Sequence, residues 1–293
     1  MTMRQFDLQD YLNHFLDANL FALDAVELEA TLATIEREVK SIHTFLLALV
    51  DTALWQSWLV QSSPYKKMIL TLGSEIDRMA STLTEPAYHS RRHVIDVCLM
   101  LSYLLKHEQS WSHDALKASP WSTSVDEKGL LLLAAVAHDL GHPGLINSVP
   151  YELEVQSLTL LKDFLPAAGF HLQDINLVLG AMEPWILATD HAQYSTLIDR
   201  LSIKPPSHTD CLAMLLVESD LASSVLPNRG VELANRLSDE WAKPYPEKSI
   251  ALRNQLGYLS FLTSLQFISP HSESATLPLI LNNSLLQLRS HLS

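Results

Sequence analysis

Apolar side chains recur at three- and four-residue intervals along most of this chain, which is the spacing of amphipathic helices. Near the N-terminus the pattern runs from Leu12 to Phe21 and then from Ala25 to Leu49. A further run, from Lys66 to Met79, precedes Glu85-Pro86, where proline disfavours a continuing helix. No stretch of useful length alternates between apolar and polar residues, so the pattern predicts an all-α fold.

The middle of the chain predicts two buried helices on either side of a polar loop. The first runs from Tyr88 to Lys106, and the second, from Lys128 to Leu140, is apolar on most sides and ends at Gly141 and Pro143-Gly144. Between them, residues 107–126 are polar and predict a loop. Later helices are predicted at Glu152–Phe164, Leu172–Ala188, His208–Ser224, Val231–Trp241 and Ile250–Ser269, with breaks at Pro205-Pro206 and Pro244–Pro246.

No low-complexity linker or internal repeat divides the chain, so we expect one compact multi-helix domain. Within it, an N-terminal helical part (1–84) should pack on a core of residues 85–270, followed by a C-terminal helical tail (271–293). The sequence does not give the oligomeric state, and a homodimer stays open.

Composition narrows the classes of function. The formal net charge of −13 argues against a general nucleic-acid binder, which needs a basic surface. The longest apolar run, Leu130–Ala137, is too short to span a bilayer, and the first residues do not resemble a signal peptide. Cys98 and Cys211 lie far apart in apolar runs, which is typical of free thiols in a reducing compartment. We therefore expect a cytoplasmic protein without a membrane partner.

Histidine and aspartate side chains form the candidate chemical site. His89 and His93 lie one helical turn apart, the doublet His138-Asp139 follows a buried helix, and Asp220 stands alone further on. Mixed imidazole and carboxylate ligands suit zinc, manganese, magnesium or iron, and the lack of cysteine ligands argues against a closed structural zinc site. The alternative is a set of surface or helix-capping polar residues. The grouping favours metal-assisted hydrolysis of a phosphoester.

Two longer segments make the prediction specific. The segment YHSRRHVIDV at residues 88–97 resembles the Tyr-His-Asn-x-x-His-Ala-x-Asp-Val signature of class I cyclic-nucleotide phosphodiesterases. The segment AAVAHDLGHPG at residues 134–144 is similar to that family's second signature, a metal motif of the HD type. Further blocks follow in family order, and together they cover roughly residues 85 to 265: Leu153-Glu154, ILATD at 186–190, Asp220-Leu221 and NQLGY at 254–258.

The resemblance implies a role for each residue of the metal site. His93, His138, Asp139 and Asp220 would hold a zinc ion, and Asp139 would bridge to a second ion, magnesium or manganese. His89 would be the general acid that protonates the leaving 3′-oxygen, a role that suits imidazole near neutral pH.

The resemblance also implies supporting residues, each with a simpler alternative. His142 and Glu154 would order metal-bound water, with Thr189 and Asp190 close by, although His142 could cap a helix and Glu154 could be a solvated helix residue. Gln255 would hydrogen-bond the purine and Tyr258 would stack on it. Alternatively, Gln255 belongs to a polar helix face and Tyr258 to an apolar stripe that packs in the core.

Some positions depart from the family pattern. Ser90 replaces asparagine after the acid histidine, and Glu218 stands two residues before the metal aspartate, where an uncharged residue is usual. The segment from Lys243 to Arg253 is too short for the family's loop over the pocket, which should leave the site more open. These losses are typical of a compact version of the catalytic domain, of the kind expected in bacteria.

The predicted function is hydrolysis of 3′,5′-cyclic nucleotides to nucleoside 5′-monophosphates. cAMP is favoured over cGMP, but only weakly, because one glutamine amide can rotate to pair with either purine. Two alternatives remain: an HD-type phosphohydrolase that acts on another nucleotide, and a catalytically silent binding protein that kept the fold.

Overall fold

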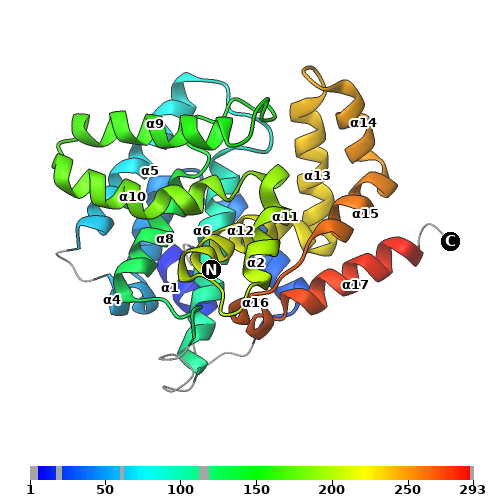
Figure 1. Ribbon diagram of the computed structural model, residues 1–293, viewed down its shortest axis with the longest axis horizontal. Helices are drawn as coiled ribbons and strands as arrows, with labels where there is room; N and C mark the ends of the chain where they lie inside the picture. The colour runs from blue at the N-terminus through cyan, green and yellow to red at the C-terminus, as the bar shows by residue number, and fades with distance from the viewer. Residues whose placement is uncertain (1–5, 18–21, 60–62, 112–118, 291–293) are drawn as a thin grey trace, which may run out of the picture.

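The structure is a computed structural model that describes residues 6–17, 22–59, 63–111 and 119–290. Over these residues it consists of helices joined by short connections and contains no β-strand, so the all-α prediction is confirmed (Figure 1). One continuous hydrophobic core extends from Leu12 to Leu281. The subdivision into residues 1–84, 85–270 and 271–293 stays a prediction.

Three helices form the centre of the molecule. They are α6 (Arg91–Lys106), α8 (Val125–Ala137) and α12 (His208–Leu221), and each is buried on all sides over most of its length. Their sequences explain this burial, because each contains a continuous apolar run instead of a single stripe: Val97–Leu101, Leu130–Ala137 and Cys211–Val217. All three pack against one another, so their ends are held in a fixed relation.

The N-terminal helices cover one side of this centre. They are α1 (Leu8–Phe15), α2 (Ala25–Glu38), α3 (Ile42–Val50), α4 (Ala53–Trp58) and α5 (Pro64–Thr82). The apolar run from Ala25 to Leu49 is divided at Ser41, which caps α3 by accepting a hydrogen bond from the backbone NH of Thr44. The carboxylate of Asp77 in α5 stabilises the start of α3 by accepting hydrogen bonds from the backbone NH groups of Ile42 and His43. The end of the first predicted run, residues 18–21, lies outside the described residues.

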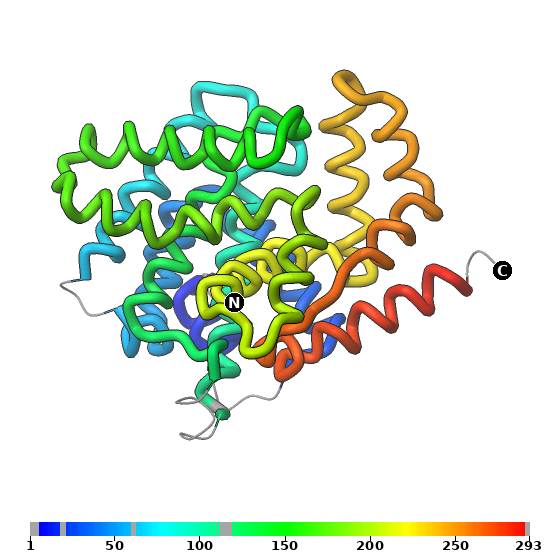
Figure 2. The backbone as a smooth tube through the Cα atoms, in the orientation of Figure 1, coloured from blue at the N-terminus to red at the C-terminus, as the bar shows by residue number. Residues whose placement is uncertain are grey.

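Two long helices, α9 (Glu152–Ala167) and α10 (Leu172–Leu187), lie side by side at one end of the molecule (Figure 2). Gly169 connects them with φ of +86°, a conformation that side-chain-bearing residues rarely adopt. A short helix, α11 (Tyr194–Ser202), then leads to α12.

The opposite end is formed by α13 (Pro227–Trp241), α14 (Pro246–Arg253), α15 (Gln255–Ser264), α16 (Pro270–Ser274) and α17 (Leu277–Ser290), the yellow to red segments of Figure 1. The prediction of one helix over Ile250–Ser269 is wrong. The chain turns at Asn254, whose side chain caps α15 by accepting from the backbone NH of Leu256. Gly257 permits this turn, because a Cβ there would lie 1.9 Å from the carbonyl oxygen of Ala251.

Part of the predicted loop at 107–126 is a 3₁₀ turn, His107–Ser110, and residues 112–118 lie outside the described residues. Within the described part of the chain, no helix combines the length and apolar character needed to cross a membrane.

Candidate active site

The predicted metal ligands meet where the three central helices converge. His93 lies in the first turn of α6, His138 and Asp139 directly follow α8, and Asp220 lies in the last turn of α12. The N-terminal end of α6 therefore faces the C-terminal ends of α8 and α12. Residues that are far apart in the sequence form one buried cluster, as the sequence predicts.

Distances within the cluster fit a divalent ion. The Nε2 atom of His93 lies 2.9 Å from Oδ1 of Asp220 and 3.4 Å from both Oδ2 of Asp139 and Nε2 of His138. The Nε2 atom of His138 lies 3.2 Å from Oδ2 of Asp139 and 3.7 Å from Oδ1 of Asp220. Ligand atoms of a tetrahedral zinc ion, each about 2.0–2.1 Å from the metal, lie about 3.3 Å from one another. Two nitrogens and two oxygens can thus hold one ion with little rearrangement.

The ring of His138 is oriented for this role. Its Nδ1 atom lies 2.9 Å from the carbonyl oxygen of Ala135 and donates to it, which leaves Nε2 as the ligand atom. The same arrangement of a backbone carbonyl behind a ligating imidazole is common in zinc proteins.

Electrostatics in the cluster also favour a cation. Burial would lower the pKa of His93, but hydrogen bonds to Asp139 and Asp220 outweigh burial and raise the pKa to about 10. Burial would raise the pKa of Asp139, yet the neighbouring His138 and His89 hold it well below its usual range. Burial would also raise the pKa of Asp220, but the hydrogen bond and charge of His93 outweigh burial and lower it. The two carboxylates therefore attract positive charge, which protons or a divalent ion can supply.

His89 lies beside the metal cluster, and Glu240 of α13 fixes its orientation. The Nδ1 atom of His89 lies 2.5 Å from Oε1 of Glu240 and donates to this carboxylate. The same carboxylate accepts from the backbone NH groups of Tyr88 and His89, at 2.8 and 3.1 Å. Burial would raise the pKa of Glu240, but its bonds to His89 outweigh burial and lower the pKa. The Nε2 atom of His89 is left available for a reacting group.

His142 completes this side of the site. Its ring stacks on that of His89 with 3.7 Å between the centroids. His89, Asp139 and His142 each offer one possible ligand atom, and these three atoms all lie within 4.8 Å of one another. Nδ1 of His142 accepts from the backbone NH of Gly144, and burial lowers the pKa of His142 to about 4, so the ring stays neutral. These three residues line a cavity of about 440 Å³ together with apolar side chains from α5, α6, α8 and α9.

Residues 88–163 match the family model of 3′5′-cyclic nucleotide phosphodiesterases, and this segment contains His89, His93, His138, Asp139, His142 and Glu154. Over these residues the chain is similar to that family. No curated protein matches the sequence significantly.

Solved structures support the same fold over nearly the whole chain. The phosphodiesterase domain of a RhoPDE fusion protein from the choanoflagellate Salpingoeca rosetta superposes with a TM-score of 0.60 at 16% identity, over 97% of this chain and 98% of that one. A second structure, of the phosphodiesterase domain of Salpingoeca rosetta rhodopsin phosphodiesterase, gives a TM-score of 0.60 at 15% identity and covers 97% and 94%. These likenesses establish the fold over nearly the whole chain.

Three of the predicted supporting residues, Glu154, Thr189 and Asp190, make contacts with the surrounding backbone and side chains. Glu154 accepts from the side chain of Asn147 at 2.9 Å, and burial raises its pKa. Asp190 accepts from the backbone NH of Tyr151 at 2.9 Å, and the Thr189 hydroxyl donates to the carbonyl oxygen of Ile186 at 2.7 Å. Their proposed roles around the metals stay predictions.

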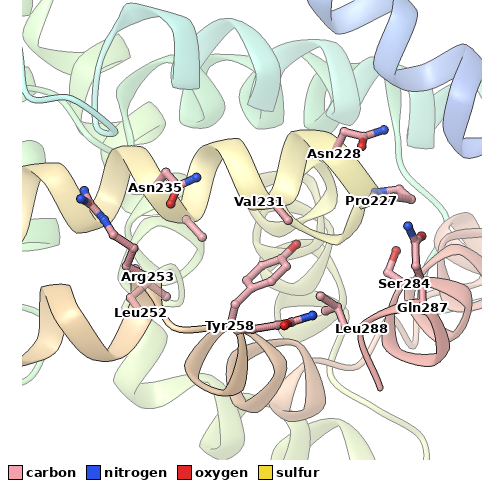
Figure 3. A pocket seen from close by; sticks show the side chains of 12 residues that line it. Pro227, Asn228, Val231, Asn235, Leu252, Arg253, Tyr258, Ser284, Gln287 and Leu288 are labelled. Atoms are coloured by element: carbon pink, nitrogen blue, oxygen red, sulfur yellow. The ribbon is translucent and has the colours of Figure 1, made fainter. Parts of the chain in front are cut away.

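Gln255 and Tyr258 lie elsewhere. Both line a cavity between α13, α15 and α17 that shares no lining residue with the cavity beside His89 (Figure 3). Tyr258 is only 5% exposed, and its hydroxyl donates to the carbonyl oxygen of Ser224 at 2.8 Å. The predicted contact of these two side chains with a purine stays a prediction, and the alternative that Tyr258 packs in the core agrees with its burial.

Glu218, one of the departures from the family pattern, has a structural explanation. Its buried carboxylate accepts from the backbone NH groups of Ile268 and Ser269 and from the hydroxyl of Ser272. It thereby holds the start of α16 against α12, and burial raises its pKa. The Glu218 carboxylate therefore has a structural role between α12 and α16.

Glu240 is the site residue that the sequence does not reveal. It lies in an amphipathic helix beside other acidic residues, such as Glu232 and Asp239, and has no local signature. Only the packing of α13 against the residues before α6 brings its carboxylate to His89.

Proposed function

We propose that this chain hydrolyses 3′,5′-cyclic nucleotides to nucleoside 5′-monophosphates with the help of divalent metal ions. The observation that carries the proposal is the convergence of two imidazoles and two carboxylates beside an imidazole whose Nδ1 atom bonds Glu240. Neither feature alone separates a catalytic site from a structural one, but a metal cluster next to an oriented acid is what phosphodiester cleavage needs.

His93, His138, Asp139 and Asp220 are the residues that would hold the first ion. Zinc suits their two imidazole nitrogens, and the carboxylate of Asp139 suits a bridge to magnesium or manganese. Bound in this cluster, such ions supply Lewis-acid polarisation of the phosphate and lower the pKa of water. His142 and Glu154 would orient water around the ions, and the electrostatic effect of Asp139 on both side chains supports this role.

His89 would supply the proton to the leaving 3′-oxygen. Its Nδ1 proton is committed to Glu240, so the proton that reaches the substrate comes from Nε2. Glu240 stabilises the protonated ring and holds it in one orientation, which an alkoxide leaving group requires because it departs poorly without a proton. The neutral ring of His142 stacks on His89 without competing for this proton.

Preference for cAMP over cGMP is the finer part of the proposal. Its support is limited to the resemblance at residues 254–258, because Gln255 and Tyr258 line a separate cavity. A direct comparison of the two substrates decides it, with kcat/KM measured for each at saturating metal.

The test of the proposed function is a screen of cyclic mononucleotides and other phosphoesters with added zinc, magnesium or manganese. Formation of 5′-monophosphates from cyclic mononucleotides, abolished in His89→Ala and Asp220→Ala, supports it. Turnover of noncyclic nucleotides alone would favour another HD-type phosphohydrolase. If the protein binds the ions but hydrolyses none of these substrates, it would be a catalytically silent binding protein.

A further inference from the structure

A further cavity, of about 330 Å³, lies between the start of α6, the middle of α13 and the segment that connects α2 to α3. Its volume falls within the range of small-molecule sites, roughly 300–1,000 Å³. The lining contains no predicted metal ligand, and neither His89, Gln255 nor Tyr258 belongs to it. The polar lining residues used below are Lys40, Glu85, Ser90, Arg91, Arg92 and Arg236.

Positive charge predominates in this lining. Its cations are Lys40, Arg91, Arg92 and Arg236, and its one carboxylate belongs to Glu85. Arg91 neutralises that carboxylate, because its Nε and Nη2 atoms bond the two oxygens of Glu85 at 3.0 and 2.8 Å. Lys40 donates to the backbone carbonyl oxygen of Glu36, an acceptor that carries no full charge. The cavity is therefore a basic site on a chain whose formal net charge is −13.

Two guanidinium groups converge at one side of the cavity. Nη1 of Arg92 and Nη2 of Arg236 bond the same atom, Oε1 of Glu36, at 2.5 and 2.6 Å. One carboxylate oxygen thus holds two like charges close together, and Glu36 is not among the lining residues. Arg236 also pairs with Glu232 through its Nη2 atom. Within the described residues, the Nε atom and the other Nη atom of both guanidinium groups have no acceptor. These NH groups can bond an anion that bridges the two arginines.

The rest of the lining suits an organic group beside the anion. Val39, Pro86 and Ile95 supply apolar surface. Ser90 makes no capping hydrogen bond to α6 through its side chain, so its hydroxyl is available to a ligand. A bare inorganic ion would leave the apolar surface in contact with water, whereas an ester group would cover it.

We propose that this cavity binds a small organic phosphate. The phosphate group lies between Arg92 and Arg236, and the organic group contacts Val39 and Pro86. Phosphate suits two arginines better than a single carboxylate does, because a phosphate monoester carries a charge of about −1.5 to −2 at neutral pH and three strong acceptor oxygens. The site does not depend on the proposed function, because none of its lining residues is a predicted metal ligand or the predicted acid.

The test measures binding and not turnover, because Glu85, Pro86, Ser90 and Arg91 line both this cavity and the cavity beside His89. Phenyl phosphate is the probe, titrated into the full chain by isothermal calorimetry and followed by ligand-detected NMR, with metal bound and again after chelation. Saturable binding with a Kd of about 1 mM or tighter is expected in both states. Phenol and inorganic phosphate, each of which lacks one half of the probe, should bind at least about fivefold more weakly.

Two substitutions with matched controls locate the binding. Arg92→Gln changes a side chain that is 51% exposed and should weaken binding of phenyl phosphate by about tenfold. Arg78→Gln is its control, because Arg78 is also exposed, pairs with one carboxylate and lies outside the lining. Lys40→Gln breaks no pair with a carboxylate, so it should weaken binding even if Arg92→Gln fails to fold. Its control is Lys162→Gln, at an exposed lysine of α9, and both controls should bind within about twofold of the unmodified protein.

Several results would overturn the proposal. Equal affinity of Arg92→Gln and Arg78→Gln for phenyl phosphate would place the ligand elsewhere, and loss of binding on chelation would place its phosphate on a metal ion. Phenol binding as tightly as phenyl phosphate would show that the phosphate is not recognised, and inorganic phosphate binding as tightly would show the same for the organic group. Absence of saturable binding at millimolar phenyl phosphate would overturn it as well, whether or not cyclic nucleotides are hydrolysed.

Discussion

The carboxylate of Glu240 lies 2.5 Å from Nδ1 of His89, although 151 residues separate the two in the sequence. The same carboxylate accepts from the backbone NH of Tyr88 and of His89. Three hydrogen bonds therefore hold the turn before α6 against α13. Gly144 allows this approach, since its φ is +73° and a Cβ there would lie 3.0 Å from Cγ of Glu240.

Replacement of Glu240 by glutamine should lower kcat for cyclic-nucleotide hydrolysis by about 10- to 100-fold. Glutamine keeps an acceptor oxygen but removes the charge that stabilises a protonated His89. The KM should change little, because Glu240 would act through His89 and not on the substrate. Steady-state kinetics at saturating metal measures both values. Glu247→Gln, an exposed change on α14, is the control, and an equal kcat for Glu240→Gln and Glu247→Gln would contradict the positioning role.

Loss of one predicted metal ligand should lower metal content as well as activity. Asp220→Ala removes one of the four ligand atoms and is expected to weaken metal binding by at least about tenfold. Metal analysis of protein purified without chelator reports this independently of turnover. Asp210→Ala, at the other end of α12, removes an aspartate that pairs with Arg200 and should leave the metal content unchanged. Equal metal content in the two variants would refute the ligand assignment.

The pH dependence of stability should reflect Glu36. Burial would raise its pKa, but Arg236 and Arg229 outweigh burial and lower the pKa to about 2. A depressed pKa stabilises the fold at pH values above the ordinary value of 4.5, and this contribution is lost as the pH falls toward 2. Because Glu36 is only half-buried and solvent screens its ion pairs, Glu36→Gln should cost on the order of 1 kcal/mol near pH 7, and the difference from the unmodified protein should vanish on acidification. Urea unfolding at several pH values measures it, and a pH-independent difference would exclude this cause.

Tyr258 should contribute to stability through its hydroxyl. Tyr258→Phe leaves the buried carbonyl oxygen of Ser224 without its donor and should cost about 1–2 kcal/mol, with cAMP turnover unchanged. Gly230→Ala should cost more, about 3 kcal/mol, because its Cβ would lie 2.0 Å from the Tyr258 hydroxyl and 2.2 Å from the Ser224 carbonyl oxygen. Chemical denaturation compares the three proteins. Unchanged stability together with impaired turnover in Tyr258→Phe would instead place the hydroxyl at the substrate.

Local patterns were sufficient to predict which side chains converge at the candidate site. His93 and His138-Asp139 stand at the ends of helices whose apolar sequence requires burial, so their convergence follows once the central helices pack together. Asp220 ends another such helix. The family resemblance at residues 88–97 and 134–144 then implies that His89 is a general acid and not a metal ligand. The hydrogen bond between His89 and Glu240 is compatible with that role.

Long-range contacts could not be predicted in the same way. Glu240 reaches His89 only through the packing of α13, and no spacing of residues along α13 encodes that contact. The break at Asn254 depends on the close approach of Gly257 to Ala251, whereas the apolar pattern alone continues from Ile250 to Ser269. The position of Gln255 and Tyr258 follows from that break, because it determines which face of α15 meets α13.

The most direct test of the proposed chemistry is the rate at which the purified full chain converts cAMP and cGMP to 5′-monophosphates, measured by chromatography before and after chelation. We expect turnover that a chelator abolishes, that zinc with magnesium or manganese restores, and that His89→Ala reduces by about 100-fold or more while metal content is retained. Undiminished turnover in His89→Ala, or no turnover of either nucleotide by the metal-loaded protein, would contradict it.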